Sequence, residues 1–339
     1  MALSKNELQL IIHNKATDKY YWPSVTDDVQ WETAWKGTPG KLTFKCCKNP
    51  KGDSLDFHEG DEVQAVYNGT PFFYGYVFIK KRNKDSIISV TAYDQIRYLK
   101  NKAVYTFQNK TAEEIIHSIA NDFQLTVGDL AVTSYVIPKY RGSNKALIDI
   151  FQDVLDMTME NEKSEEGKQY HKLYVLYDDF GSLVVKRLED LQVPILIDNE
   201  TAEDFDYEST IDKDTYNRVK LYYDDKDSGE RQVWQAQNSA DIKRWGVLQL
   251  CESVDPKRPI NLAEMAEKKL KYYDRVHRTL TIKGAAGDIR VRGGSSVGVK
   301  LNLGDKELNQ LLIVNRVTHT FVNGSHIMDL DVIGDVITG

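Results

Sequence analysis

The stretch LTIKGAAGDIRVRGGSSV, from Leu280 to Val297, repeats an order of residues that first occurs between Leu42 and Val63. Both stretches contain a Leu-Thr-x-Lys step, a Gly-Asp pair and a Gly-x-x-Val step, with apolar residues at alternate positions before the last step. Alternation with a period of two is typical of β-strands that bury one face, and glycines permit the bends between them. The sequence therefore predicts the same β meander twice.

The segments around these stretches also have the pattern of strands and tight turns. Asn68-Gly69 separates two strand-like runs in the first region, and Asn323-Gly324 does so in the second. Asn-Gly between alternating segments is the strongest short-range hairpin signal. Gene duplication explains the two regions, and chance similarity between two antiparallel meanders is the alternative. The shared order and spacing of the motifs favour duplication.

The middle of the chain changes character. Thr111-Ala-Glu-Glu114 has the capping-box pattern of a helix start, followed by apolar residues at helical spacing. A second helix is expected to start near Ser143, and Asn261-Leu-Ala-Glu264 predicts a further capped helix later in the chain. The sequence thus predicts a mainly β fold with an α+β insertion. We expect a first β-barrel domain at residues 1–105, a mixed middle domain at 106–210, and a second β-barrel domain with an inserted helix at 211–339.

Composition narrows the possible functions. The 339 residues carry 44 Lys and Arg against 51 Asp and Glu, a formal net charge of −7, and 41% of the residues are hydrophobic. An acidic chain lacks the clustered cations that specific nucleic-acid recognition needs. No apolar run approaches the roughly 18 residues of a membrane span, and no signal peptide is evident, so we expect synthesis in the cytoplasm without membrane insertion. Three cysteines cannot form a disulfide framework.

Two short patterns resemble ligand-binding loops without matching them. Gly293–Gly298 looks like part of a phosphate loop, but Lys300 comes one place late, and strands are expected on both sides. Asp225–Gly229 looks like half of a calcium loop, but its glycine is one position early and Ala236 replaces the bidentate Glu. We therefore expect no nucleotide binding at the first pattern, and a surface turn explains the second better.

His319 and His326 lie across the second Asn-Gly hairpin and are candidates for a metal pair. A metal would need a third ligand, for which Asp329 or Asp331 are the nearest carboxylates. A stacked or hydrogen-bonded histidine pair is the simpler interpretation, and the sequence predicts no metal.

Three acids, Asp204, Asp206 and Glu208, form a possible glycosidase-like cluster. An exposed strand or loop with alternating acids produces the same pattern, and this interpretation is preferred. No hydrolase motif occurs elsewhere in the chain. The sequence therefore predicts no catalytic or cofactor-binding site and no enzyme.

A family resemblance rests on motifs in a fixed order. Val317–Leu330 (VTHTFVNGSHIMDL) resembles the closing hairpin of the XkdQ-type tail proteins of the phage-like element PBSX, which are related to baseplate hub proteins of contractile phage tails. Ala92-Tyr-Asp94 and the helix start at Thr111 extend the resemblance over most of the chain. Each motif alone is weak, because these are hairpin and cap residues.

The resemblance implies a structural protein. Family hubs are homotrimers in which two tail-tube-like β-barrels per subunit make a pseudo-sixfold ring. This ring joins the six-fold tail tube to the three-fold central spike. The expected partners are therefore the tube protein, the spike, and the baseplate wedge and tape-measure proteins. The expected location is the baseplate of a virion, a defective prophage particle, a phage-tail-like bacteriocin or another contractile injection system.

Interface residues stay open at this stage. Trp31, Trp35, Trp234 and Trp245 are candidate anchors, because aromatic residues dominate binding hot spots, and core burial is the competing explanation for each. Two other functions remain alternatives to the hub. One is a tail-associated cell-wall hydrolase acting through acids near Asp204, and the other is a cell-surface carbohydrate-binding module.

Overall fold

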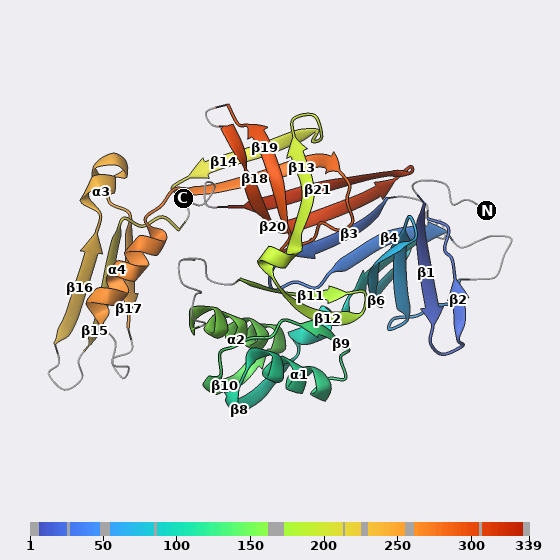
Figure 1. Ribbon diagram of the computed structural model, residues 1–339, viewed down its shortest axis with the longest axis horizontal. Coiled ribbons are helices and arrows are strands. Elements are labelled where there is room, and N and C mark those ends of the chain that lie inside the picture. The colour runs from blue at the N-terminus through green and yellow to red at the C-terminus, as the bar shows by residue number, and fades with distance from the viewer. Residues whose placement is uncertain are drawn as a thin grey trace. The chain divides into compact units, whose positions relative to one another are not determined.

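The computed structural model describes residues 7–25, 28–47, 55–84, 87–161, 173–212, 214–224, 230–254, 261–304 and 307–334. Contacts group the chain into two compact units, residues 1–205 with 281–332 and residues 206–280 with 333–339. Strands dominate both units (Figure 1). The mainly β class with a mixed middle region, predicted from the sequence, is confirmed. The division into three domains at 105/106 and 210/211 stays a prediction about independent folding.

The largest sheet contains thirteen strands. They are hydrogen-bonded in the order β14-β18-β21-β20-β3-β4-β7-β6-β5-β1-β2, and β19 branches from β20 and pairs with β13. The strands of the first β region are β1 (Leu8–Asn14), β2 (Lys19–Tyr21), β3 (Val29–Ala34), β4 (Lys41–Cys47), β5 (Glu62–Tyr67), β6 (Thr70–Arg82) and β7 (Ile87–Tyr93). The later strands are β13 (Gln192–Asp198), β14 (Asp204–Thr210), β18 (His277–Ala286), β19 (Ser296–Asn302), β20 (Glu307–Val322) and β21 (Ser325–Ile333).

The two closed barrels are the part of the fold prediction that needs correction. β20 is 16 residues long and pairs with β19 through its first half and with β3 through its second half. His319 stands opposite Trp31 in this second pairing. The two β regions therefore share one sheet, and its described strands follow an open path that does not close into a barrel. The physical reason is the pairing of β20 with both β19 and β3, which makes the two regions neighbours within one sheet.

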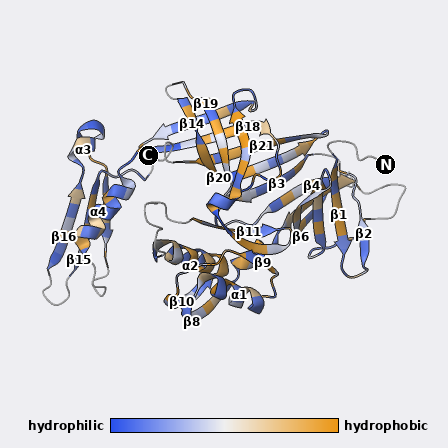
Figure 2. Ribbon diagram, viewed as in Figure 1, coloured by the Kyte–Doolittle hydropathy of each residue, from blue (hydrophilic) through white to orange (hydrophobic). Residues whose placement is uncertain are grey.

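The alternation of apolar and polar residues in the sequence corresponds to an alternation of buried and exposed side chains along the strands. Along β7 every second residue is buried, and the same period occurs in β6 and β20. Figure 2 shows the corresponding change between hydrophilic and hydrophobic residues along the strands. In the two repeated stretches, Gly60 and Gly294 both adopt φ +89°, so the same bend is made at the same step. Gly52-Asp53 of the first stretch lies outside the described residues.

Two hairpins follow the Asn-Gly pairs. Asn68 and Gly69 have φ +50° and +80°, and Asn323 and Gly324 have φ +49° and +76°. Positive φ at both central residues is the geometry of the tight hairpin turn that Asn-Gly favours. The hairpins β5–β6 and β20–β21, predicted from the sequence, are confirmed.

The mixed region packs two helices over short strands. The 3-10 helix η1 (Gln95–Lys100) follows β7, and α1 (Ala112–Asp122) begins at the predicted capping box of Thr111 and Glu114. The second helix, α2 (Leu147–Asn161), begins after the predicted start near Ser143, because residues 137–146 form a strand instead. The remaining elements are β8 (Lys102–Lys110), β9 (Val127–Leu130), β10 (Ile137–Ala146), β11 (Tyr174–Asp179), β12 (Ser182–Arg187) and the 3-10 helix η2 (Leu188–Leu191).

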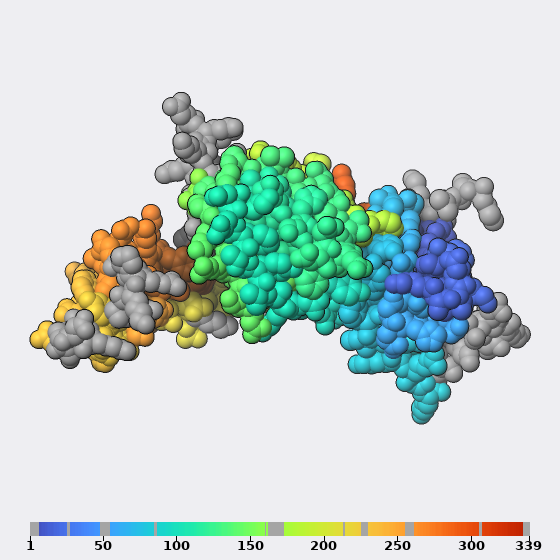
Figure 3. All heavy atoms as spheres, turned by 90° about the horizontal axis from the view of Figure 1, so that it is seen from below, coloured from blue at the N-terminus to red at the C-terminus, as the bar shows by residue number. Residues whose placement is uncertain are grey.

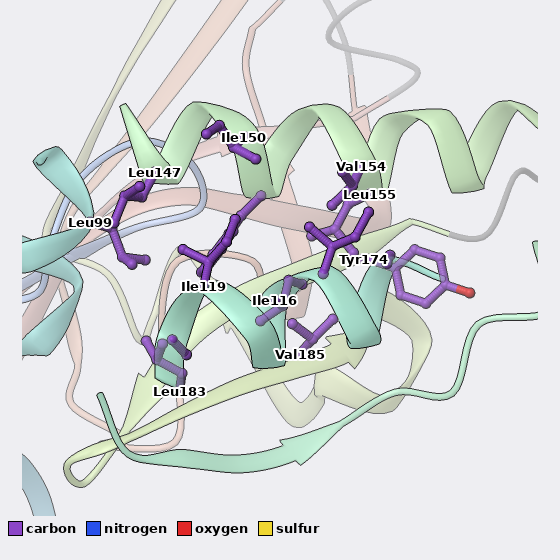
Figure 4. Packing of buried hydrophobic residues seen from close by; sticks show 14 of the residues in the cluster. Leu99, Ile116, Ile119, Leu147, Ile150, Val154, Leu155, Tyr174, Leu183 and Val185 are labelled. Atoms are coloured by element: carbon purple, nitrogen blue, oxygen red, sulfur yellow. The ribbon is translucent and has the colours of Figure 1, made fainter. Parts of the chain in front are cut away.

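The core of the mixed region lies between α1 and α2. Ile116 and Ile119 of α1 are fully buried with Ile150 and Val154 of α2, and Leu183 of β12 packs from below (Figure 4). Each such aliphatic side chain contributes about 1.5–3 kcal/mol through burial. In Figure 3 the side chains of this region, coloured green, form one continuous surface.

The second unit is a small two-layer structure. A three-stranded sheet in the order β16-β15-β17 is covered on one face by α4 (Leu262–Tyr273), whose start is capped by Asn261 as predicted. Its other elements are β15 (Arg218–Asp224), β16 (Arg231–Gln237), α3 (Ser239–Trp245) and β17 (Gln249–Ser253). None of the helices in the described residues of either unit is long and apolar enough to cross a membrane.

Candidate functional site

A pair of glycines in the loop between β18 and β19 packs against two other strands, β3 and β11. The Gly293 N–H donates a hydrogen bond to Thr33 Oγ1 at 2.9 Å, and a Cβ at Gly293 would stand 2.1 Å from the carbonyl carbon of Ala34. A Cβ at Gly294 would stand 2.4 Å from Val175 of β11. The glycines of the phosphate-loop-like pattern are therefore required for packing β3 and β11 against this loop.

Arg292 directly precedes these glycines, and its side chain points toward β11. Its guanidinium carbon lies 3.8 Å from the centroid of the Tyr177 ring, and its Nη2 donates a hydrogen bond to the Asp178 carbonyl oxygen at 2.7 Å. A guanidinium over a ring face is attracted by the ring's electron density. The side chain is therefore held by β11 while its backbone belongs to the second β region.

Two buried carboxylates lie near Arg292. Asp94 caps η1, accepting a hydrogen bond from the Ile96 N–H at 3.0 Å and a second from the Gly40 N–H at 2.8 Å. Burial, and next the charge of Asp178, raises the pKa of Asp94 well above its usual range. Burial also raises the pKa of Asp178 to about 6. A nearby cation offsets part of the cost of keeping such groups ionised away from water.

We call Asp94, Asp178 and Arg292 the junction cluster. Asp94 follows β7, Asp178 lies at the end of β11, and Arg292 precedes β19, so the cluster joins the first β region, the mixed region and the second β region. Asp178 Oδ2 and Arg292 Nε are buried and make no hydrogen bond within the described part of the chain. Buried charges in this arrangement tolerate little displacement, because moving the cation away from the carboxylates removes the attraction that offsets their burial. The junction cluster is therefore a candidate for the site that holds these three regions in fixed relative positions.

The two candidate metal histidines form a hydrogen-bonded pair, as preferred from the sequence. His319 Nε2 lies 2.9 Å from the Val291 carbonyl oxygen and must donate to it, so His319 Nδ1 accepts from His326 Nε2 at 2.9 Å. Burial lowers the pKa of His319 to about 3 and that of His326 to about 4. Both rings are neutral at pH 7.

Aromatic and glycine contacts hold this histidine pair. The His319 ring stacks on Trp31 at 4.7 Å, and the His326 ring stacks on Phe321 at 4.3 Å. A Cβ at Gly287 would lie 2.2 Å from His326 Cγ, so the Gly-Asp step of the second stretch exists to admit this ring.

The carboxylates expected to assist a metal are used elsewhere. Asp329 accepts a hydrogen bond from the Gly284 N–H, and Asp331 accepts one from the Thr281 hydroxyl, each at 2.8 Å. Within the described ranges, no group of three or more His, Cys, Asp and Glu side chains is placed to hold a metal.

The three candidate hydrolase acids lie along one exposed edge. Asp204, Asp206 and Glu208 alternate on β14 and are all exposed, and β14 is paired only with β18 among the described strands. Charged residues on an edge strand discourage unwanted strand pairing. This row has the geometry of a protected edge, with the carboxylates side by side on a strand. The calcium-like residues Asp225–Gly229 lie outside the described residues.

The tryptophans differ from one another in exposure. Trp31 is buried in the core of the first β region with 3% exposure, because it occupies an inward position of β3. Trp35, Trp234 and Trp245 are partly buried. Trp22, which the sequence did not single out, is 65% exposed. Its position before Pro23 was the available signal, since a residue before proline is typical of a loop or strand end.

Comparison with known proteins places this geometry in a family. A family model described as YQBQ-like matches residues 29–333. The chain belongs to the YQBQ-like family. It is 29% identical over 316 residues to the uncharacterized protein YqbQ of Bacillus subtilis (strain 168), covering 91% of this chain and 92% of that protein. Phage-like element PBSX protein XkdQ of the same organism is 28% identical over 278 residues, covering 81% and 82%. The XkdQ resemblance predicted from the hairpin and cap motifs is confirmed.

Solved structures share the YQBQ-like fold at low sequence identity. The 43 kDa tail protein of prophage MuSo2 from Shewanella oneidensis matches with a TM-score of 0.69 at 11% identity, covering 98% of each chain. The E. coli c3393 protein matches with a TM-score of 0.52 at 10% identity, covering 96% of this chain and 76% of its own. That protein is a component of the type VI secretion system with structural similarity to the T4 tail proteins gp27 and gp5. The fold is therefore that of a prophage tail protein.

Proposed function

We propose that this YQBQ-like chain is a structural baseplate hub of a contractile phage tail or tail-like particle, acting without catalysis. The observation that carries the proposal is the single sheet that runs through both β regions and is fixed by the junction cluster. A PBSX phage-like element protein is its relative, and a prophage tail protein has its fold. A rigid chain with two related β regions suits a part that transmits position between larger components.

The hub is a homotrimer that joins the six-fold tail tube to the three-fold central spike. Three chains with two related β regions each offer six near-equivalent surfaces to the tube and three to the spike. Closed rotational symmetry lets the same surfaces be used in every copy and leaves no open end. Baseplate wedge and tape-measure proteins are the further partners, and the particle baseplate, assembled in the bacterial cytoplasm, is the location.

Sedimentation of the purified chain, alone and with its tube and spike proteins, tests this proposal. The expected species contains three chains of 38.8 kDa each, and electron microscopy of the mixture should show three-fold averages with the hub between tube and spike. A chain that stays monomeric both alone and with its tube and spike proteins would overturn the proposed hub function.

Cell-wall hydrolysis is tested separately. The row of Asp204, Asp206 and Glu208 lies along one exposed strand, whereas glycosidases place two carboxylates on either side of a bound sugar. We therefore expect no clearing of peptidoglycan suspensions by the purified chain. Clearing that Asp204→Ala abolishes would establish an enzyme instead.

A further inference from the structure

The three-stranded sheet of the second unit has one uncovered face. α4 lies on the other face (Figure 1), where its Leu262, Ala266 and Leu270 form a core with alternate residues of the strands. The residues between these point away from α4, because successive side chains of a strand lie on opposite faces. All of these outward residues are exposed or half-buried in the part of the chain that the structure describes. A ligand can therefore reach this side of the sheet.

The outward residues form three rows across β16, β15 and β17, and most of them are polar. The rows are Gln237-Arg218-Gln249, Gln235-Lys220-Cys251 and Val233-Tyr222-Ser253. We call these residues the open face. Its central strand, β15, contributes Arg218, Lys220 and Tyr222, so two cations and an aromatic ring follow one another along the middle of the sheet.

The open face is positively charged, although the whole chain is acidic. Residues 206–280 carry as many Lys and Arg as Asp and Glu, so the negative net charge comes from the rest of the chain. The open face itself contains Arg218 and Lys220 and neither Asp nor Glu. Two cations in adjacent rows therefore attract an anion to the middle of the sheet.

The three strands contain only two acids, Asp224 and Glu252, and each has its own cation. Asp224 lies beyond the last row, where its two carboxylate oxygens accept hydrogen bonds from Arg231 Nε and Nη2 at 2.7 and 3.1 Å. Glu252 points toward α4 and pairs with Lys269 at 2.8 Å. The charges of Arg218 and Lys220 are therefore not offset by a carboxylate of their own sheet.

Hydrogen bonds on the open face leave donors free and use up an acceptor. Arg218 Nε donates to Gln237 Oε1 at 3.0 Å, and Gln235 Nε2 donates to the same oxygen at 3.1 Å. The amide nitrogen of Gln237 and the Nη groups of Arg218 remain as donors, and Lys220 Nζ has no hydrogen-bond or ion-pair partner within the described residues. Cationic donors of this kind match the oxygens of a phosphate or carboxylate group.

Planar groups lie beside the two cations. The guanidinium carbon of Arg231 lies 4.8 Å from the centroid of the Tyr222 ring, and Asp224 holds this guanidinium in place. Unpaired bases stack on tyrosine rings and on arginine guanidinium planes. A single-stranded nucleic acid offers an oxyanion and a flat ring in every repeat, whereas a duplex hides the ring faces by pairing and an acidic peptide has no regular rings.

We propose that the open face binds single-stranded nucleic acid, with phosphates on Arg218 and Lys220 and a base on the stacked pair of Tyr222 and Arg231. Phosphate contacts carry no base information, so this binding is independent of nucleotide sequence. It is compatible with the expectation from composition that the chain does not recognise specific nucleic-acid sequences. The inference concerns the second unit and does not depend on the proposed hub function.

Fluorescence anisotropy of a fluorescein-labelled oligothymidine, titrated with the full chain, tests the proposal. The expected Kd is about 1–100 µM at physiological salt. Arg218→Gln with Lys220→Gln should weaken binding about tenfold and reduce the slope of log Kd against log salt by about 1.4, because each phosphate contact contributes about 0.7. Tyr222→Leu should weaken binding about tenfold without changing the slope, because it removes stacking and no charge.

A control variant removes the same charge from the other side of the unit. Lys268→Gln with Lys271→Gln changes two exposed residues of α4, the helix on the covered face, and should leave the Kd and the salt slope unchanged. Bound oligothymidine should also slow the alkylation of Cys251, which is exposed in the same row as Lys220. Alkylation of Cys47, in the first β region, should keep its rate.

Four results would overturn the proposal. They are no binding by the wild type, equal weakening by the α4 control, unchanged binding by Tyr222→Leu, and competition by duplex DNA or polyglutamate as strong as that by unlabelled oligothymidine. Circular dichroism verifies folding. If the double variant of the open face unfolds, Lys220→Gln alone replaces it, with an expected slope change of about 0.7. The mass of the free chain decides the hub function and has no part in this test.

Discussion

At the scale of single residues, close contacts between neighbouring groups explain why a particular residue type stands at a particular position. Gly287 is glycine because the His326 ring occupies the space of its Cβ, at 2.2 Å. His326 in turn is neutral, because burial lowers its pKa to about 4. The histidine pair therefore works as a packed, hydrogen-bonded unit of the second hairpin.

Gly287→Ala should lower the free energy of unfolding by about 1–3 kcal/mol, because the added methyl group forces the His326 ring or the backbone to move. Urea unfolding monitored by circular dichroism measures the effect. The matched control is the same substitution in a His326→Ala background, where the methyl group has room. An equal cost in both backgrounds would show that the ring is not the obstacle.

His319 and His326 should make unfolding stability fall as the pH drops. Their pKa values are about 3 and about 4 in the folded chain, below the usual 6.5. Between these values the unfolded chain binds more protons, so this contribution is complete above about pH 6.5 and is lost toward pH 4. We expect the stability advantage of the wild type over His326→Phe to shrink between pH 7.5 and pH 5. His117→Phe, at an exposed position of α1, is the control and should leave the difference constant.

At the scale of elements, the junction cluster shows how three regions of one unit are held. η1, the β11–β12 hairpin and the loop before β19 each contribute one charged side chain. The local segments form by their own signals, since Asp94 is an N-cap and Gly294 is a bend. Their mutual position depends on Arg292, which donates a hydrogen bond to the Asp178 carbonyl oxygen, lies over the Tyr177 ring and places its charge near the two buried carboxylates.

Arg292→Met should destabilise the chain by about 3 kcal/mol at pH 7.5, because two buried carboxylates lose their cation. Asp178 has its pKa raised to about 6 by burial, so at pH 5 it is protonated and the loss should be smaller. Denaturant midpoints at both pH values measure this. Adding Asp178→Asn should recover part of the loss, and no recovery would mean that Arg292 acts through its stacking on Tyr177.

At the scale of the whole molecule, contacts divide the chain into two units with separate cores. Leu221 is fully buried in the core of the second unit, and Leu312 is fully buried in the first. Residues 206–280 begin within β14 and end within β18 in the chain order. The two units should therefore respond separately to damage.

Calorimetry should show two transitions. Leu221→Ala should shift only one of them and Leu312→Ala only the other, each by about 2–5 kcal/mol in its own unit. The two variants serve as controls for each other. A single transition that both variants shift equally would show that the units unfold together.

Much of the local structure was predictable because its causes lie within a few residues. The capping box at Thr111 and the hairpin at Asn323-Gly324 are both confirmed. The inward position of Trp31 and the exposure of Trp22 were not predictable, because strand alternation does not say which face is covered. The start of α2 was misplaced because the pairing of β10 with β8 overrode the helical spacing of the residues before Leu147.

The sequence by itself determined the mainly β class, the mixed middle region, the caps and the Asn-Gly turns, because each depends on backbone preferences and on nearby side chains. Only the tertiary structure decided that the two β regions share one open sheet, since that depends on β20 meeting β3 across more than two hundred and fifty residues of chain. It also decided that Gly293 packs against Ala34 and that Arg292 meets Asp178. Such contacts are set by the complementarity of whole surfaces, which no local pattern encodes.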